Sequence, residues 1–225
     1  MVSVCMATFN GEAFVKEQID SILLQLQPED ELIVSDDGSS DSTLQIISAI
    51  GDPRIHIFKN SFKNVVKNFE FAISQSKGDY IFLSDQDDIW HDQKVQSYLK
   101  CFKESSADLV VSDVAIIDAQ GNIKEVDFYP QGFNAGTFTN LKKNNFIGCA
   151  MAFRKHTKKW FLPFPINTPM HDWWIGLAVG KKGTIKYLDQ KLINYRRHSG
   201  NVTSGKKSSL WNIVSWRWIL IKNLC

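Results

Sequence analysis

Short apolar runs that end in acidic residues constrain this chain more than any other feature. The run Tyr80–Leu83 leads into the segment Ser84–Trp90, whose letters are SDQDDIW, and the run Glu31–Ser35 leads into the pair Asp36–Asp37. Apolar runs of this length, bounded by turn residues, are typical of buried strands. Two acidic strand ends in one alternating chain indicate a ligand site at the carboxyl edge of a sheet.

Segments typical of strands and helices alternate through the first half. This alternation favours a Rossmann-like α/β fold with a mostly parallel central sheet and helices on both faces. The elements expected there are strand Val2–Ala7, helix Phe14–Leu26, strand Glu31–Ser35, helix Ser42–Ile50, strand Arg54–Phe58, helix Val65–Ser76, strand Tyr80–Asp85, helix His91–Lys103 and strand Asp108–Ser112. The less regular second half is expected to form a surface loop over Asn122–Asn140, a strand over Phe146–Phe153, a helix over His171–Lys181 and two short strands or a hairpin over Thr184–Arg197.

The composition narrows the class of protein. A length of 225 residues, with 44% hydrophobic and 22% charged residues, fits one soluble globular domain. The net charge of +2 gives no general reason to expect a nucleic-acid partner. The four cysteines are far apart and form no C-x-x-C pair, which argues against zinc and favours reduced thiols. No secretory signal and no apolar run of about 20 residues is present, so we expect a cytoplasmic protein.

The acidic residues after Leu83 indicate a divalent cation. Asp85, Asp87 and Asp88 would repel one another unless a cation lay among them, and Mg²⁺ is commonly held by one or two carboxylates together with substrate phosphates. A cap on the helix expected near His91 is the alternative, but three acids exceed what a cap needs. The sequence therefore predicts a metal site that faces a phosphorylated substrate.

Further motifs resemble those of the family 2 glycosyltransferases over nearly the whole chain. They are, in order, Ala7–Glu12, Ser35–Thr43, Asn60, Lys67–Glu70, Gly78–Ile81, Ser84–Trp90, His171–Trp174 and Tyr195–His198. Each motif is weak alone, but their order and spacing together are specific. The form SDQDDxW resembles the rhamnosyltransferase-like branch, which builds cell-surface polysaccharides. The resemblance implies the GT-A nucleotide-diphospho-sugar transferase fold.

Two departures from the family are visible. Asn64 stands where the family often has Gly, and Asn tolerates a left-handed backbone better than most residues. The chain also leaves little room for an added acceptor domain or for membrane spans.

The resemblance implies a nucleotide site built from several loops. It places Thr8, Asn10 and Glu12 in a wall of this site, Asp36 on the nucleobase edge, Lys67 within reach of the nucleotide and Asp85 beside the ribose or the metal. Simpler roles compete with each of these assignments. They are a helix cap for the first loop, an Asx turn for Asp36 and a solvated helix face for Lys67. Asp37 is expected to support its loop or the metal site.

The resemblance also implies a centre for Mn²⁺ or Mg²⁺ and a sugar pocket beside it. Asp87 is expected to be the direct metal ligand, with His198 as a further ligand. The residues assigned to the donor or acceptor pocket are Asp88, Trp90, His171, Trp173, Trp174, Arg196 and Arg197. The arginines would stabilise charge on the diphosphate, unless they only form a basic surface turn. The tryptophans would either pack in the core or offer a flat wall to a sugar ring.

Asp172 is the expected catalytic residue. Sugar transfer requires an acceptor hydroxyl to lose its proton as it attacks the anomeric carbon, and a carboxylate near the donor can take that proton. In inverting relatives the acid at this motif is the general base. The alternative is an N-cap for the helix that opens at His171.

The end of the sequence carries a separate signal. We divide the chain into a catalytic domain over residues 1–205 and a basic, Trp-rich amphipathic helix over residues 206–225. Trp favours the membrane interface and Lys favours anionic lipid, so this helix is expected to contact the membrane surface, where a lipid-linked acceptor would give it a purpose. The alternatives are a helix packed on the catalytic domain and an oligomer contact.

The expected activity is inverting, metal-dependent transfer from a UDP- or dTDP-sugar to a glycan or lipid-linked glycan, at the inner face of the cell membrane. A sugar nucleotidyltransferase would instead show a Gly-rich phosphate loop with Arg and Lys in place of Thr8–Glu12. A non-catalytic nucleotide-sugar binder or scaffold is a third possibility. The presence of Asp85, Asp87 and Asp172 together argues against it.

Overall fold

One curled sheet with helices on both sides makes up the fold. The computed structural model describes residues 1–124, 127–129, 132–201 and 209–224, and in these the sheet has nine strands in the order β3-β2-β1-β4-β8-β6-β9-β5, with β7 beside β6. The strands are β1 (Val2–Thr8), β2 (Glu31–Asp36), β3 (Ile55–Lys59), β4 (Tyr80–Asp85), β5 (Ile89–Trp90), β6 (Leu109–Asp118), β7 (Ile123–Lys124), β8 (Met151–Arg154) and β9 (Ile185–Arg197). The helices are α1 (Val15–Leu23), α2 (Thr43–Ile50), α3 (Val65–Gln75), α4 (Lys94–Glu104), α5 (Thr137–Lys142), α6 (Lys158–Phe161), α7 (His171–Lys182) and α8 (Leu210–Leu224).

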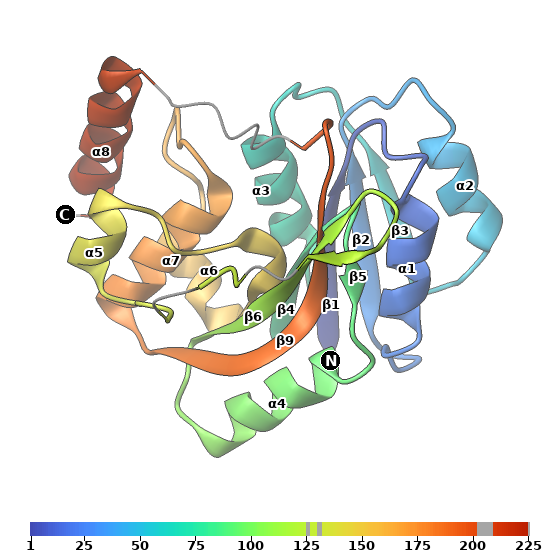
Figure 1. The fold of residues 1–225 in the computed structure, drawn as a ribbon, viewed down its shortest axis with the longest axis horizontal. Helices are drawn as coiled ribbons and strands as arrows, with labels where there is room; N and C mark the ends of the chain where they lie inside the picture. Colours follow the sequence, from blue (N-terminus) through green and yellow to red (C-terminus); the bar gives the residue numbers. More distant parts are fainter. Residues whose placement is uncertain (125–126, 130–131, 202–208, 225) are drawn as a thin grey trace.

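The first half forms the parallel part of the sheet. β1 runs between β2 and β4, and β3 lies outside β2, with all three pairings parallel. Figure 1 shows α1 and α2 on one side of these strands and α3 on the other. Every residue of β1 and β2 is buried, which explains why they read as continuous apolar runs rather than alternating ones. The α/β fold with a mostly parallel sheet is therefore confirmed.

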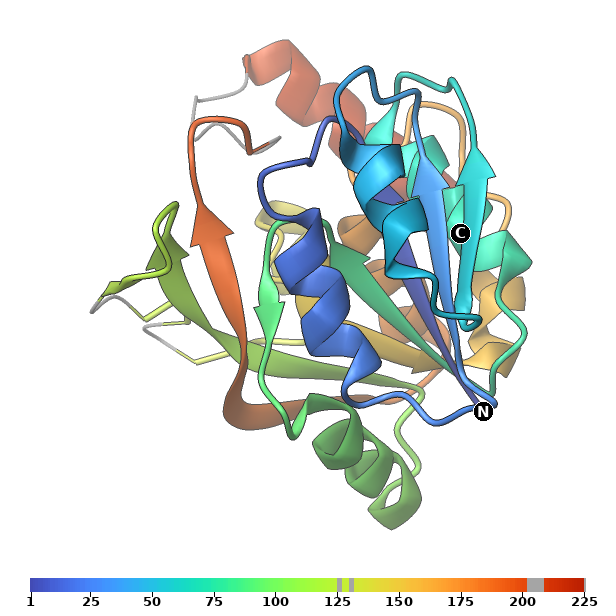
Figure 2. The ribbon, with the colours of Figure 1, turned by 90° about the vertical axis from the view of Figure 1, so that its right-hand side faces the viewer.

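The second half departs from the expectations at three places. β9 is one strand of 13 residues that curls along β6, so the prediction of two short strands or a hairpin over Thr184–Arg197 is wrong (Figures 1 and 2). Two register shifts in the β6–β9 pairing accommodate the polar stretch that resembled a turn. The expected loop over Asn122–Asn140 contains β7 and the start of α5, and the expected strand over Phe146–Phe153 opens with a 3₁₀ turn at Gly148–Ala150.

Parallel pairing brings the acidic strand ends to one edge of the sheet. Thr8 at the end of β1 pairs with Asp36 of β2, and Ala7 pairs with Asp85 of β4. Asp36 and Asp85 therefore lie on either side of the end of β1. Since ligands of open α/β sheets bind at the carboxyl ends of the strands, this edge is the place to look for a site.

The last described helix packs on the domain. α8 contacts α5 and α7, and Leu220 of α8 is completely buried. Lys206 and Lys207, which belong to the predicted basic helix, lie outside the described residues. Among the residues described, no helix is both long and apolar enough to cross a bilayer.

Candidate active site

Asp36 organises the first loop of the site. Its side chain is fully buried and accepts hydrogen bonds from the hydroxyl of Thr8 (2.8 Å) and from both the amide (2.9 Å) and the hydroxyl (2.6 Å) of Ser39. Gly38 N–H donates a fourth bond at 3.1 Å. A carboxylate has about four acceptor positions, so these donors use its whole capacity. The geometry therefore favours the turn-forming role of Asp36 over the direct base contact that we expected.

Asn10 and Glu12 tie this loop to the start of α1. The side-chain oxygen of Asn10 accepts the Ser40 amide at 2.9 Å, and Oε2 of Glu12 accepts the Ser42 amide at 2.8 Å. Asn10 takes a left-handed backbone with φ of 47°. Both residues lie in the expected wall and join its two loops to each other.

The loop before α3 is also anchored to the strand ends. Asp37 accepts the amides of Lys63 (2.9 Å) and Asn64 (2.8 Å), which is the supporting role expected of it. Asn64 then caps α3 by accepting the amides of Val66 and Lys67. The Lys67 side chain is exposed on the first turn of α3.

Two of the three acidic residues at and just after the end of β4 form a close group. One ligand atom each from Asp85, Asp88 and Cys149 lie within 4.8 Å of one another. Asp88 is fully buried, its Oδ1 accepts the Arg196 amide at 2.9 Å, and its Oδ2 has no partner among the described residues. Burial, and then the charges of Asp88, Asp87 and Asp172, raise the pKa of Asp85 well above its usual value. The same burial, followed by the charge of Asp87, raises the pKa of Asp88 to about 7.

The raised pKa values of Asp85 and Asp88 result from burial and from the closeness of several carboxylates. A bound cation would relieve them, because an opposite charge favours the ionised form. Oxygen ligands suit Mg²⁺ and Mn²⁺, whereas the thiol of Cys149 does not, and burial raises the pKa of that thiol. The donor set at this strand end therefore fits a hard divalent ion.

Asp87 points to a different neighbour, His198. Nε2 of His198 lies 2.8 Å from Oδ2 of Asp87, and the side-chain amide of Asn201 donates to the same oxygen at 3.1 Å. Because the Gly200 amide donates to Nδ1 of His198, the ring carries its proton on Nε2 and gives it to Asp87. The predicted metal ligands are thus together as a hydrogen-bonded pair. An ion shared by both would have to replace this hydrogen bond.

Asp172 lies on α7, within electrostatic reach of the acidic group. It lies in the first turn of this helix, is 7% exposed, and its charge acts on Asp85. Oδ1 accepts the Trp173 amide at 2.6 Å and the Asn144 side chain at 3.4 Å. Burial raises the pKa of Asp172 to about 6. A carboxylate with a raised pKa is a stronger base than an ordinary Asp, which suits proton abstraction.

The residues beside Asp172 belong to the core. The indole N–H of Trp173 donates to Asn140 O and that of Trp174 to Phe161 O, and both rings are buried, so burial favours the core role over a sugar wall. His171 stacks on Phe69 with ring centroids 3.9 Å apart. Burial lowers the pKa of His171 to about 3, so the imidazole is neutral.

Arg196 and Arg197 have different environments. The guanidinium of Arg196 donates to the carbonyls of Asp87 (2.7 Å) and Ala119 (3.2 Å) and to Glu17 (2.6 Å). These contacts engage all three of its guanidinium nitrogens, which favours a role in positioning the acidic loop over the expected contact with a diphosphate. Arg197 is exposed, with its guanidinium 5.4 Å from the Tyr195 ring.

Trp90 and Lys94 lie beneath the acidic group. Trp90 is 2% exposed, and Nζ of Lys94 lies 3.9 Å from its ring centroid, so Trp90 supports the site from the core. Sequence reasoning missed Lys94, which is fully buried and donates to Cys149 O at 2.6 Å. Burial lowers its pKa to about 7, while the charges of Asp88 and Asp85 oppose that shift.

Two further residues of the site were also missed. The side-chain amide of Gln86 accepts the Phe9 amide at 2.9 Å and donates to the Phe9 carbonyl at 3.0 Å, which joins the acidic loop to the loop after β1. The Phe9 ring is 55% exposed beside Thr8, an apolar surface that suits a flat ring. An aromatic residue at the tip of a strand-end loop was the available signal for Phe9.

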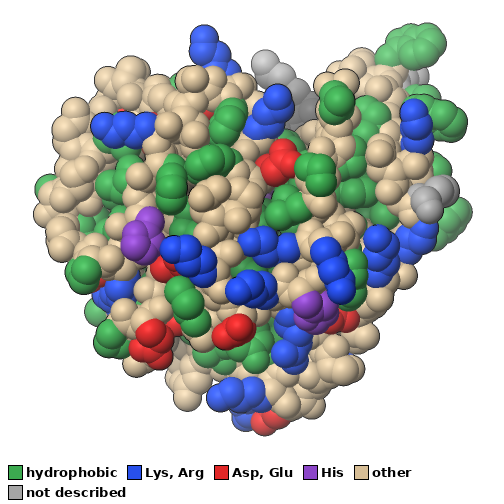
Figure 3. All heavy atoms as spheres, turned by 180° about the vertical axis from the view of Figure 1, so that it is seen from behind, with side chains coloured by type: hydrophobic (Ala, Val, Ile, Leu, Met, Phe, Trp, Pro, Cys, Tyr) green, Lys and Arg blue, Asp and Glu red, His purple; other side chains and the backbone are tan. Residues whose placement is uncertain are grey.

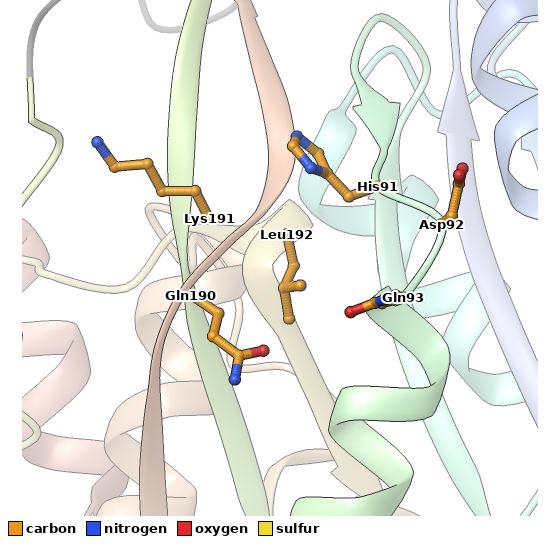
Figure 4. A pocket seen from close by; sticks show the side chains of 6 residues that line it. All are labelled: His91, Asp92, Gln93, Gln190, Lys191 and Leu192. Carbon is orange, nitrogen blue, oxygen red and sulfur yellow. The ribbon is translucent and has the colours of Figure 1, made fainter.

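The surface hollow in Figure 4 is separate from this site. It measures about 510 Å³ and lies between the segment after β5 and the middle of β9, lined by His91, Asp92, Gln93, Gln190, Lys191 and Leu192. Lys191 and Asp92 point away from it on opposite sides (Figure 4). None of the predicted site residues lines this hollow, so it carries no part of the expected chemistry.

Comparison with known proteins agrees with the geometry. The family described as glycosyl transferase family 2 matches residues 3–161. A dTDP-rhamnosyl transferase, RfbG from Shigella flexneri, is 31% identical over 87% of this chain and 72% of its own length. The Escherichia coli protein WfgD, described as a UDP-Glc:alpha-D-GlcNAc-diphosphoundecaprenol beta-1,3-glucosyltransferase, is 26% identical over 95% of this chain and 85% of its own.

A solved structure shows the same fold. The Staphylococcus aureus TarS fragment 1–349, in complex with UDP-GlcNAc, superposes with a TM-score of 0.79 at 17% identity. The match covers 99% of this chain and 66% of the TarS fragment. The expected GT-A fold is thereby confirmed. With the family match spanning most of its length, the chain belongs to glycosyltransferase family 2.

Proposed function

We propose that this protein transfers a sugar from a nucleotide-diphospho-sugar to an acceptor hydroxyl with inversion at the anomeric carbon. The observation that carries the proposal is that Asp172, on the separate element α7, lies close enough to the acidic end of β4 for its charge to act on Asp85. A buried carboxylate opposite a cation-binding strand end suits a base that works beside a bound diphosphate.

Asp172 removes the proton of the acceptor hydroxyl as its oxygen attacks the anomeric carbon. The bond from that carbon to the diphosphate oxygen breaks, and the electron pair leaves with the nucleoside diphosphate. Attack on the face opposite the diphosphate inverts the centre. The Trp173 amide and the Asn144 side chain stabilise the ionised form of Asp172 and hold its Oδ1 in place.

A divalent ion, Mn²⁺ or Mg²⁺, fits the acidic strand end. Asp85, Asp87 and Asp88 would hold it, with His198 beside Asp87, because these carboxylates are crowded and Oδ2 of Asp88 is buried without a partner among the described residues. Such an ion supplies positive charge to the departing diphosphate. The loops tied together by Asp36, Asn10 and Glu12 form the wall for the base and ribose, with the exposed Phe9 ring at its edge.

The relatives indicate the class of donor and acceptor. RfbG is named for dTDP-rhamnose, and WfgD for a UDP-sugar donor and a diphosphoundecaprenol-linked acceptor. We therefore expect a dTDP- or UDP-sugar donor and a lipid-linked glycan acceptor. Such an acceptor places the reaction at the inner face of the cell membrane, in the synthesis of a cell-surface polysaccharide.

Thermal unfolding with UDP, dTDP, GDP and CDP, each with and without Mn²⁺, tests donor binding. A ligand that binds the folded state raises Tm by mass action. We expect a shift that depends on Mn²⁺ for dTDP or UDP. If none of the four nucleotides moves Tm in the presence of Mn²⁺, the proposed donor site is wrong.

The role of Asp172 is tested with Asp172→Asn. This variant keeps the shape of the side chain but cannot take a proton, so transfer should fall by about 10²–10⁴-fold while the nucleotide-induced Tm shift remains. Asp79→Asn is the matched control, because it changes an exposed carboxylate that pairs with the N-terminal amino group of Met1. Transfer at a near wild-type rate by Asp172→Asn would exclude this base.

A further inference from the structure

One face of α8 carries an apolar stripe that the proposed chemistry does not use. Trp211, Val214, Trp218 and Ile221 follow one another at intervals of three and four residues, so they share one side of the helix. Their exposed fractions are 85%, 62%, 66% and 42%. A contiguous exposed patch of large apolar side chains marks an interaction site more often than an ordinary surface.

The opposite side of α8 is already occupied by the domain. Leu220 is completely buried, and Trp216 and Leu224 pack against the hydrophobic core. The guanidinium of Arg217 donates to the Leu141 carbonyl at 3.0 Å and so ties α8 to the end of α5. These contacts fix the rotation of α8 about its own axis, so the apolar stripe faces away from the domain.

The half of the chain that ends in α8 is rich in basic residues. Residues 128–225 contain sixteen Lys and Arg but only two acidic residues, Asp172 and Asp189, an imbalance that the net charge of +2 conceals. Neither α5 nor α8 contains an acidic residue, whereas Lys142 and Lys222 are exposed on them. Figure 3 shows hydrophobic side chains on the outer surface of α8, at the right-hand edge, and many Lys and Arg side chains across the same view of the molecule.

We propose that this face docks α8 on the surface of an anionic lipid bilayer, with Trp211 and Trp218 in the headgroup region. Trp side chains favour that region, and the exposed Lys142 and Lys222, on helices without acidic residues, favour anionic lipid. A second copy of the chain is a poorer occupant, because stripe-to-stripe contact would bring two basic surfaces together. At about 1.5 Å per residue, a 15-residue helix is too short to span a bilayer, and its inner side is bound to protein. It therefore lies along the membrane surface.

Docking at a membrane would serve the proposed function, and its use to the protein depends on that function being correct. α8 packs on α7, the helix whose first turn carries Asp172. Docking of α8 would hold the catalytic domain where a lipid-linked acceptor has its polar end. A residence at the membrane would raise the local concentration of such an acceptor.

Vesicle flotation of the full chain tests the proposal. The vesicles are phosphatidylcholine alone and phosphatidylcholine with phosphatidylglycerol, each at low and high salt. We expect the protein to float with the anionic vesicles, less at high salt, and the double variant Trp211→Ser/Trp218→Ser to lose at least about tenfold in partitioning. Leu24→Ser, which removes an 82% exposed apolar side chain beyond the end of α1, is the matched control and should float like the wild type.

Two results would overturn the docking surface. The first is equal flotation of the wild type and the double variant. The second is a vesicle-free dimer, seen by sedimentation equilibrium, that the double variant converts to a monomer, since the stripe would then bind a second copy. The nucleotide-induced Tm shift separates this inference from the proposed function. The double variant should keep that shift, and a wild type that floats but shows no shift would count against the donor site alone.

Discussion

At the residue scale, the environment of Asp172, the proposed base, determines the pH range that we expect for activity. Burial raises its pKa to about 6, and only the ionised form can accept the acceptor proton. With a saturating donor, we expect kcat to fall as pH drops through about 6, by about tenfold at pH 5. A kcat–pH profile measures this limb.

The Asn144 side chain offers a second test of the same limb. Its amide donates to Oδ1 of Asp172 at 3.4 Å and so favours the ionised carboxylate. Asn144→Ala should move the acidic limb to higher pH. A limb that stays in place in this variant, or one that persists in Asp172→Asn, would assign the titration to another group.

Gln86 links the acidic loop to the loop after β1, the two loops of the proposed donor site. Its amide makes two hydrogen bonds with the Phe9 backbone, and a Cβ at Gly11 would come within 2.3 Å of its oxygen. Gln86→Leu removes both hydrogen bonds, so the free energy that holds the two loops together should fall by about 1–3 kcal/mol. We expect nucleotide affinity, measured by titration calorimetry, to fall about tenfold or more. Gln96→Leu on the exposed face of α4 is the control, and an equal loss there would remove the special role of Gln86.

At the element scale, Arg196 joins the end of β9 to the acidic loop, α1 and the turn after β6. Its backbone amide donates to Asp88, its guanidinium to Asp87 O, Ala119 O and Glu17, and its carbonyl accepts the Asn201 side chain. Arg196→Lys keeps the charge, but the single nitrogen of Lys cannot make the three separate hydrogen bonds of the guanidinium. We expect a loss of about 2 kcal/mol in stability and a higher Mn²⁺ concentration for half-maximal activity.

The control for Arg196 is its neighbour. Arg197→Lys changes an exposed side chain that lies beside the Tyr195 ring and away from the acidic loop's hydrogen bonds, so the Mn²⁺ requirement should not change. If both variants show the same Mn²⁺ requirement as the wild type, the contacts of Arg196 have no part in placing the acidic loop.

Strand ends were predictable from the sequence, whereas the partners of their side chains were not. The buried strands β1, β2 and β4 are recognisable in the sequence as apolar runs. Because they pair in parallel, their carboxyl ends lie at the same edge of the sheet. β9 was not predictable as one strand, because the polar Asp189–Lys191 stretch resembles a turn and only its pairing with β6 overrides that signal.

The same limit applies to the site residues. Sequence motifs name Asp36 and Arg196, but the hydrogen bond from Thr8 to Asp36 and the three guanidinium contacts of Arg196 come from distant segments. Lys94 could not be found by pattern, since a single Lys in a helix is ordinarily solvated and only packing buries it. Local pattern thus locates the site, and long-range contacts decide which side chain does what.

At the scale of the whole molecule, folding concentrates negative charge at one edge of the sheet. Burial raises the pKa of Asp88 to about 7 and that of Asp172 to about 6, and it also raises the pKa of Asp85. The folded state therefore binds more protons than the unfolded chain between about pH 4 and 7. Without divalent ions, the free energy of unfolding should fall as pH rises through that window.

The buried Lys94 acts with the opposite sign above this window. Burial lowers its pKa to about 7, so from about pH 7 to 8 the folded state binds fewer protons than the unfolded chain, and stability rises again. At higher pH the thiols of the unfolded chain ionise while burial keeps Cys5 and Cys149 protonated, which opposes this rise. We therefore expect a minimum near pH 7 in urea unfolding measured with a chelator present. Mn²⁺ should raise the free energy of unfolding near pH 7 and so remove the minimum, because it binds the ionised carboxylates of the folded state.

The matched variants for the stability minimum are Asp88→Asn and Asp79→Asn. The first removes a buried carboxylate that must otherwise ionise near pH 7, so the fall in stability between about pH 4 and 7 should become shallower. The second removes an exposed carboxylate at the opposite end of β4 and should leave the profile unchanged. A metal-free wild type whose stability instead rises from pH 4 to 7 would show that the acidic edge is already compensated within the fold, and the need for a cation there would lose its physical basis.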